Sequence, residues 1–206
     1  RALALARDDL LYLRPDHPMV LSAQELLLSA ESGNAAFLVD DALPQRTVVL
    51  EAVYVLECIA DRALQVSRFL PPEPVLVAVD TRLQLREGFH PSSKAIERGA
   101  DRMVDLQRLR KPIATLVPPM LKRASEEAVT LAGERAEQAV ATADALLGRE
   151  VERLAALAKI NPAVRPEEVA RLEAEREAVL AVLPNTRPRL DALRLVVSPD
   201  FLRLAG

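Results

Sequence analysis

The feature that most constrains the fold of this chain is a helical pattern that runs from about Met120 to Ile160. The stretch follows the Pro118-Pro119 pair and is rich in Ala, Leu, Glu and Arg, which favour helices. At ~1.5 Å per residue such a helix reaches roughly 60 Å, which exceeds the width of a small domain. Part of it must therefore project from the fold or lie along another element.

A second helix is predicted directly after the first. Asn161-Pro162 ends the long helix, Pro166 with two following glutamates suits a first helical turn, and Pro184-Asn185 ends the second helix near Leu183. Two helices joined by a short turn predict an antiparallel hairpin, at about 120–160 and 166–183. A separate helical segment is predicted from Ala95 to about Leu109, with a break at the prolines 112, 118 and 119.

The first half of the chain reads as a sheet. The pattern of β-branched runs, prolines and loops predicts strands at 36–39, 47–59, 64–69 and 75–79. In the strand at 47–59, apolar side chains from Val48 to Cys58 alternate with a face that carries Glu51 and Glu57. A strand with one core face and one partly wet face is typical of an antiparallel sheet rather than a doubly wound parallel one.

The two ends of the chain complete the predicted fold. Asp16-His17-Pro18 caps a helix through Leu28, which Gly33-Asn34 ends. Leu190 to Val197 predicts a strand, and because an isolated strand is unstable in water, we expect it to return to the sheet. The sequence thus predicts one α+β unit: a mainly antiparallel sheet with an N-terminal helix (1–94), a helical region with a long inserted antiparallel hairpin (95–189), and a returning strand and tail (190–206).

Residue patterns that carry chemistry are missing from the sequence. The six glycines are scattered, so no phosphate-binding loop or dinucleotide fingerprint exists, and no hydrolase elbow is present. Both histidines, His17 and His90, precede a proline and lack a second ligand, so we expect structural roles and no zinc site. A lone Cys58 on an apolar strand face indicates core packing. The sequence predicts no catalytic residue, cofactor or metal in this chain.

Composition restricts the location and the partners. No pattern of a signal peptide or a membrane-spanning helix is found, and one cysteine cannot form an internal disulfide, so we expect a cytoplasmic protein. The start at Arg1 rather than methionine suits a fragment of a longer protein. A net charge of −3 and six aromatic residues give no global reason to expect nucleic-acid binding.

Charge is nevertheless distributed unevenly along the chain. The segment 94–123 holds eight basic against three acidic residues, whereas 166–183 holds two basic against five acidic residues. An ordinary solvated surface explains the basic segment, but it could also meet a phosphate backbone or an acidic protein surface. The candidate contact residues are Arg98, Arg102, Arg108, Arg110, Lys111, Lys122 and Arg123.

Several short runs resemble a known family when they are taken in order. They are Asp16-His17-Pro18-Met19-Val20, Leu26-Leu27-Leu28, Gly33-Asn34, the run from Val49 to Glu57, Arg68-Phe69-Leu70-Pro71-Pro72, Asn161-Pro162, Val179-Leu180 and Arg189-Leu190-Asp191-Ala192-Leu193-Arg194-Leu195. Together they resemble the C-terminal region of the RapA family, bacterial RNA polymerase-associated ATPases of the Swi/Snf helicase class. One departure is Pro188, where the family pattern leads us to expect an aromatic residue.

The resemblance implies a function that depends on a larger protein. The ATP- and DNA-handling lobes, with their ATP and Mg²⁺, would lie upstream of this chain, and the parent would act in transcription recycling. We therefore expect a non-catalytic accessory and docking region whose partners are the ATPase lobes of the same parent and RNA polymerase, and which contacts no membrane. Two alternatives stay open: direct binding of DNA or RNA through the segment 94–123, and self-association through the helical hairpin.

Overall fold

The computed structural model describes residues 17–29, 34–99 and 106–205 and divides the chain into two units, residues 1–35 and 36–206. In the first unit, helix α2 (Pro18–Ser29) confirms the predicted N-terminal helix. Its first turn is closed by His17, whose Nδ1 accepts a hydrogen bond from the amide of Met19 at 3.2 Å. The predicted cap Asp16 and stop Gly33 lie outside the described residues.

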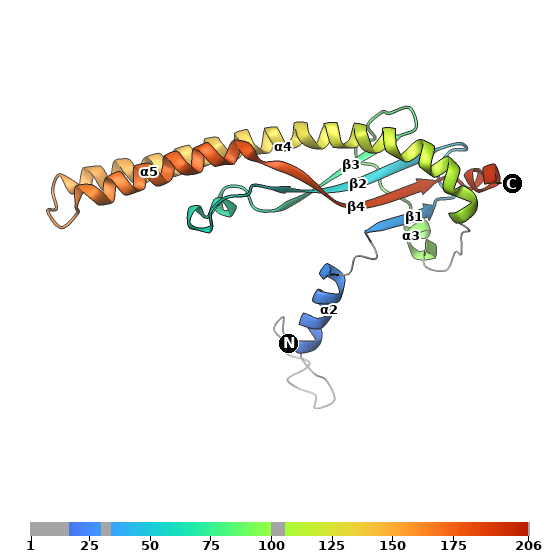
Figure 1. The fold of residues 1–206 in the computed structure, drawn as a ribbon, viewed down its shortest axis with the longest axis horizontal. Coiled ribbons are helices and arrows are strands. Elements are labelled where there is room, and N and C mark those ends of the chain that lie inside the picture. The colour runs from blue at the N-terminus through green and yellow to red at the C-terminus, as the bar shows by residue number, and fades with distance from the viewer. Residues whose placement is uncertain (1–16, 30–33, 100–105, 206) are drawn as a thin grey trace. The chain divides into compact units, whose positions relative to one another are not determined.

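The second unit contains one four-stranded sheet in the order β1-β4-β2-β3, formed by β1 (Ala35–Val39), β2 (Val48–Glu57), β3 (Glu73–Asp80) and β4 (Arg187–Val197). Strand β2 pairs antiparallel with both β3 and β4. The arrows of β1 and β4 point the same way in Figure 1, so the sheet is mainly antiparallel. The last strand of the sequence does return to the sheet, where it lies between β1 and β2, and the predicted α+β class is confirmed.

One face of the sheet is covered by α4 (Leu106–Ala158), the longest helix in the described part of the chain. The helix approaches closely because small residues recur on its inner side every three or four positions, and the side chains there are at most 4% exposed. Two of them, Ala124 and Ala128, pack in one cluster with inward residues of β2 such as Leu50 and Tyr54. The buried alanines are Ala124, Ala128, Ala132, Ala136, Ala139 and Ala143.

The expected break in this helix at the prolines is wrong. Helix α4 begins at Leu106 and continues through Pro112, Pro118 and Pro119. A proline inside a helix removes one hydrogen bond and usually costs about 3 kcal/mol, but tertiary packing can offset that cost. Here Leu109 and Met120, on either side of the prolines, are each 1% exposed in the core. The helix bends over the end of the sheet in this stretch instead of breaking (Figure 1).

The predicted strand at 64–69 is also wrong. This segment forms two short 3-10 turns, η1 (Arg62–Leu64) and η2 (Val66–Arg68), separated by Gln65 with a φ of 46°. A residue with positive φ cannot continue a strand, and the Asp61 side chain caps the first turn by accepting the amide of Ala63 at 2.9 Å. The apolar side chains of this 3-10 segment pack on helices rather than on the sheet. The segment therefore supports helices instead of extending the sheet.

The second face of the sheet is covered at one end by α3 (Ser93–Gly99) and the loop before it. Ala95 packs on Leu38 and Val196 there. Asp40 holds this layer in place by accepting hydrogen bonds from the amide and hydroxyl of Ser92, both at 2.7 Å. The predicted helix from 95 to 109 is therefore two helices, α3 and the start of α4, on opposite faces of the sheet.

The face of β2 that carries Glu51 is partly wet as expected, since Val53, Val55 and Glu57 on it are half-buried, but Glu51 itself is buried. The side chain is 1% exposed, and its Oε2 accepts a hydrogen bond from Nε of Arg194 at 2.5 Å. Its Oε1 is buried without a partner among the described residues. The sequence could not predict this burial, because it depends on neighbouring strands that are distant in the chain. Among the described residues, no helix is long and apolar enough to span a membrane.

Candidate functional site

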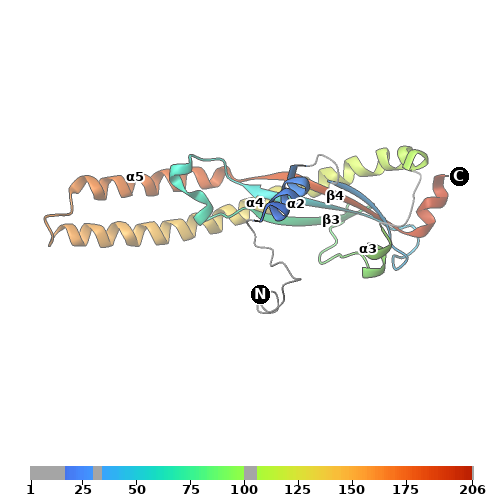
Figure 2. The ribbon, with the colours of Figure 1, turned by 90° about the horizontal axis from the view of Figure 1, so that it is seen from below.

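The helical hairpin is the part of the unit that extends furthest from the sheet. Helix α5 (Pro166–Val182) packs antiparallel on the second half of α4, which confirms the predicted hairpin. Both views show the two helices side by side beyond the end of the sheet (Figures 1 and 2). An ion pair between Arg176 on α5 and Asp144 on α4 joins the helices along the hairpin.

The base of the hairpin is braced by a small core of its own. Leu183 and Val179, which are 0% and 1% exposed, pack against the buried side of α4 around Ala143. The 3-10 segment contributes Leu64, Val66, Phe69 and Leu70 to the same cluster. The segment that we expected to be a strand therefore fixes the direction of the hairpin. No sequence signal for this role exists, since it depends on the fold.

The tip of the hairpin exposes an apolar side chain. Ile160 is 80% exposed in the turn between the two helices, and it lies between the exposed cations Lys159 and Arg165 of the same turn. Helix α5 then begins with Glu167 and Glu168, so the charge changes sign within a few residues. A single exposed apolar side chain is ordinary on a protein surface, so Ile160 shows that the tip is accessible and does not by itself define a contact patch.

The basic candidate residues are divided by the fold rather than gathered into one patch. Arg98 lies on α3 and pairs with Asp41 at 3.3 Å, on the opposite face of the sheet from α4. Arg123 pairs with Glu127 one helical turn later, at 3.2 Å. The side chains of Arg108, Arg110, Lys111 and Lys122 are exposed on α4, and Arg102 lies outside the described residues.

The residues considered for catalysis or metal binding are not assembled into a centre. Within the described ranges, no group of three or more His, Cys, Asp or Glu side chains could hold a metal ion. Cys58 lies just beyond the end of β2 and its Sγ donates to the carbonyl of Val182 at 3.3 Å. Burial raises the pKa of this thiol, which keeps it in the unreactive neutral form. Burial likewise raises the pKa of the Tyr54 phenol in the core.

The fold and these surfaces define an α+β domain that carries a braced, projecting helical hairpin. The model of the RNA polymerase recycling family, C-terminal region, matches residues 1–198. The chain is 37% identical over 205 residues to the RNA polymerase-associated protein RapA of Pectobacterium atrosepticum, covering 96% of this chain and 21% of that protein. It is 36% identical over 204 residues to RapA of Histophilus somni, with the same coverage.

The chain belongs to the RNA polymerase recycling family, as its C-terminal region. This confirms the resemblance that the short sequence runs indicated. The chain spans about a fifth of the length of the curated relatives it matches, 21% in each of the two cases above.

Proposed function

We propose that this chain is a non-catalytic docking region of a longer ATP-dependent protein that associates with RNA polymerase. The observation that carries the proposal is the hairpin, which is braced at its base and exposes Ile160 at its tip. A stiff arm with an exposed apolar end suits contact with another protein surface better than it suits chemistry. The names of the relatives, RNA polymerase-associated proteins, support polymerase as one partner of the longer protein.

The hairpin has two candidate partners, RNA polymerase and the ATPase lobes of the parent. A pull-down with this 206-residue chain as bait, carried out separately with purified polymerase and with the expressed lobes, distinguishes them. Ile160→Asp should weaken the retained interaction by about fivefold or more, as expected for an anchor residue at a contact. Val129→Asp is the matched control, because Val129 is 58% exposed on α4 but lies over the sheet and away from the tip.

The absence of catalysis is tested separately. The isolated chain should neither bind nor hydrolyse ATP, since we assign those steps to the lobes of the longer protein. Nucleotide turnover that persists after rigorous removal of contaminating ATPases would contradict the proposal. So would a pull-down in which neither partner is retained, or one in which Ile160→Asp and Val129→Asp have equal effects.

Direct nucleic-acid binding is a second candidate function, and the exposed cations on the first half of α4 favour it. Arg110, Lys111 and Lys122 are all exposed there, whereas Arg98 and Arg123 are held in ion pairs. Affinity for duplex DNA should fall steeply with salt, and neutralising Arg108, Arg110 and Lys111 should flatten that dependence. A salt-independent or undetectable interaction would exclude this function.

Self-association through the hairpin has weaker support. The alanine stripe of α4 that could pair with a second copy is already buried against the sheet and α5 of the same chain. Sedimentation at several protein concentrations would test this, and a monomer throughout would exclude it.

A further inference from the structure

The outer edge of β3 is only half occupied by the chain itself. After β3 the backbone turns back on itself. The amide of Arg86 donates to the carbonyl of Ala78 at 2.9 Å, and the amide of Asp80 donates to the backbone carbonyl of Gln84 at 3.0 Å. The return then ends, because Gly88, with a φ of 63°, turns the chain toward the other face of the sheet. Along the first half of β3, from Glu73 to Val77, no strand of the described ranges lies on this edge.

The orientation of the free backbone groups follows from the paired ones. Backbone groups alternate in direction along an antiparallel strand, and those of Ala78 and Asp80 point outward. The carbonyl and amide of Leu76, the amide of Ala78 and the carbonyl of Pro74 therefore also point outward. None of them has a partner among the described residues. An exposed row of this kind is a template for one more short strand, and Pro74, which lacks an amide hydrogen, limits its length.

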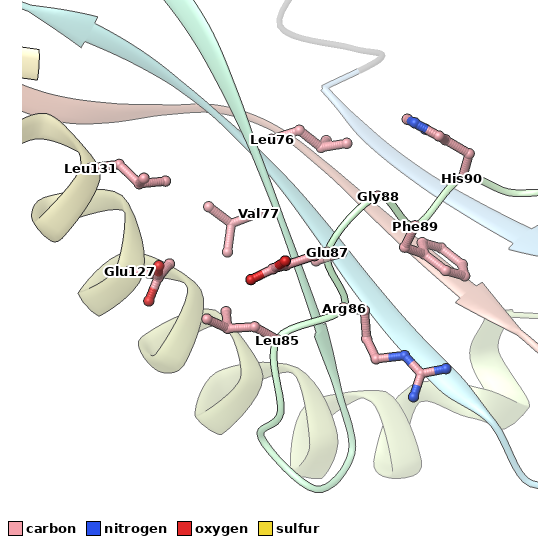
Figure 3. Close-up of a pocket in the computed structure, with 11 residues that line it drawn as sticks. Leu76, Val77, Leu85, Arg86, Glu87, Gly88, Phe89, His90, Glu127 and Leu131 are labelled. Atoms are coloured by element: carbon pink, nitrogen blue, oxygen red, sulfur yellow. The ribbon is translucent and has the colours of Figure 1, made fainter.

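A cavity of about 290 Å³ lies beside this free edge. Leu85, Leu131 and Val77 supply an apolar lining, and Figure 3 shows the Glu87 side chain directed toward α4, where Glu127 lies. Arg86 also lines the cavity, but its side chain is directed away from Glu87 and pairs with Asp80 at 3.7 Å. Glu87 has no hydrogen bond or ion pair to any described residue. Arg123 donates to Oε2 of Glu127, and Oε1 has no partner in the part of the chain that the structure describes.

We propose that this edge and cavity bind an extended segment of a partner protein that carries a lysine or arginine. The segment would add to β3 as a fifth strand, and alternate side chains would point to the face covered by α4. One of them enters the cavity, where its aliphatic stem lies on Leu85 and Leu131 and its cation meets Glu87 and Oε1 of Glu127. Lysine and arginine have this combination of apolar stem and charged end.

A second copy of this chain is a poorer occupant than a partner segment. Paired with itself, the edge Glu73–Val77 would place Glu73 and Pro74 in the new ladder and would offer no cation to the cavity. The basic residues at the start of β4, Arg187 and Arg189, are already paired with Glu57 at 3.7 and 3.2 Å. The inference is independent of the docking role proposed for the hairpin, because the two surfaces share no residue.

The test uses a short fluorescent peptide of alternating threonine and valine with one central lysine, titrated into the full 206-residue chain. We expect it to bind more tightly than the same peptide with glutamine in place of lysine. Glu87→Gln should weaken binding of the lysine peptide by about two- to fivefold, the range for one exposed ion pair. Glu97→Gln, which changes another exposed carboxylate on α3, is the matched control and should leave the affinity unchanged.

Backbone pairing is tested with two N-methylated peptides. Methylation of alternate peptide amides on the edge that faces β3 should abolish binding, whereas methylation of the other set should not. The amides of Leu76 and Ala78 should also gain protection from hydrogen exchange in the complex. The proposal is overturned if the peptide does not bind, if both methylated peptides bind alike, if Glu87→Gln has no effect, or if the chain instead dimerises through β3.

Discussion

Removal of the arginine that pairs with the buried Glu51 gives the sharpest test of the packing. Glu51 is 1% exposed in the centre of the sheet, and one of its oxygens is paired with Arg194, whose side chain is 34% exposed. The substitution Arg194→Leu keeps the apolar stem but leaves a carboxylate buried without a cation. Loss of one partner from a fully buried pair costs ~3–5 kcal/mol.

The partial exposure of Arg194 reduces that figure, because water screens the outer side of the pair. We expect Arg194→Leu to lower the free energy of unfolding by about 3 kcal/mol, the low end of the range. In a domain of this size 1 kcal/mol shifts Tm by about 2–4 °C, so Tm should fall by about 6–12 °C. The assay is urea denaturation followed by circular dichroism, together with a thermal scan.

The double variant Glu51→Leu with Arg194→Leu should recover most of that loss, because it removes the buried charge together with its partner. Arg189→Leu, on the same strand, is the control: its pairs with Glu57 and Asp191 are exposed, and its loss should change stability by no more than about 0.5 kcal/mol. The reasoning is refuted if Arg194→Leu costs under about 1 kcal/mol, or if the two substitutions are additive.

Three further predictions follow from buried or strained positions. Leu183→Ala should lower the free energy of unfolding by about 2–5 kcal/mol and speed amide hydrogen exchange in α5, because Leu183 is 0% exposed. Unchanged exchange would show that Leu183 does not hold α5 in place. Burial raises the pKa of Asp40, but hydrogen bonds from Ser92 and Ala42 outweigh it and lower the pKa. Its contribution to stability is therefore present above the usual value of 3.8 and lost as pH falls through the folded pKa. Asp40→Asn should make the free energy of unfolding depend less steeply on pH in the acid range. An unchanged slope of stability against pH would contradict this. Because Gly88 has a φ of 63°, Gly88→Ala should lower the free energy of unfolding by about 1–2 kcal/mol, and Gly88→Asn should lower it less. Both are measured by urea unfolding, and equal losses would show that backbone strain is not the cause.

The elements with a strong local signal could be predicted from sequence. The hairpin is predictable because Pro162 and Pro166 mark its turn and the flanking stretches are rich in helix formers. The alternation in β2 correctly predicts the buried set of Val48, Leu50, Ala52 and Tyr54, since a period of two needs no knowledge of neighbouring strands. The division of the chain into the ranges 1–94, 95–189 and 190–206 remains a prediction.

The errors arose where distant parts of the chain outweigh local preference. Pro112 and Pro118 favour a helix break, yet burial of Leu109 and Met120 keeps α4 continuous. The apolar residues around Leu64 read as a strand, although the cluster that they join forms only when the hairpin folds back against them. Local propensities are small compared with the free energy of burying several apolar side chains, so packing decides such cases.

The functional surfaces show the same division. Sequence alone determined the helical hairpin, the absence of familiar catalytic motifs and the family, because each is recognised from short runs of neighbouring residues and from their order along the chain. Only the tertiary structure decided that Arg98 and the α4 cations lie on opposite faces of the sheet, and that Glu87 and Glu127 lie beside one cavity. The reason is physical: a surface is formed by residues that the fold brings together, and their separation along the chain does not reveal it.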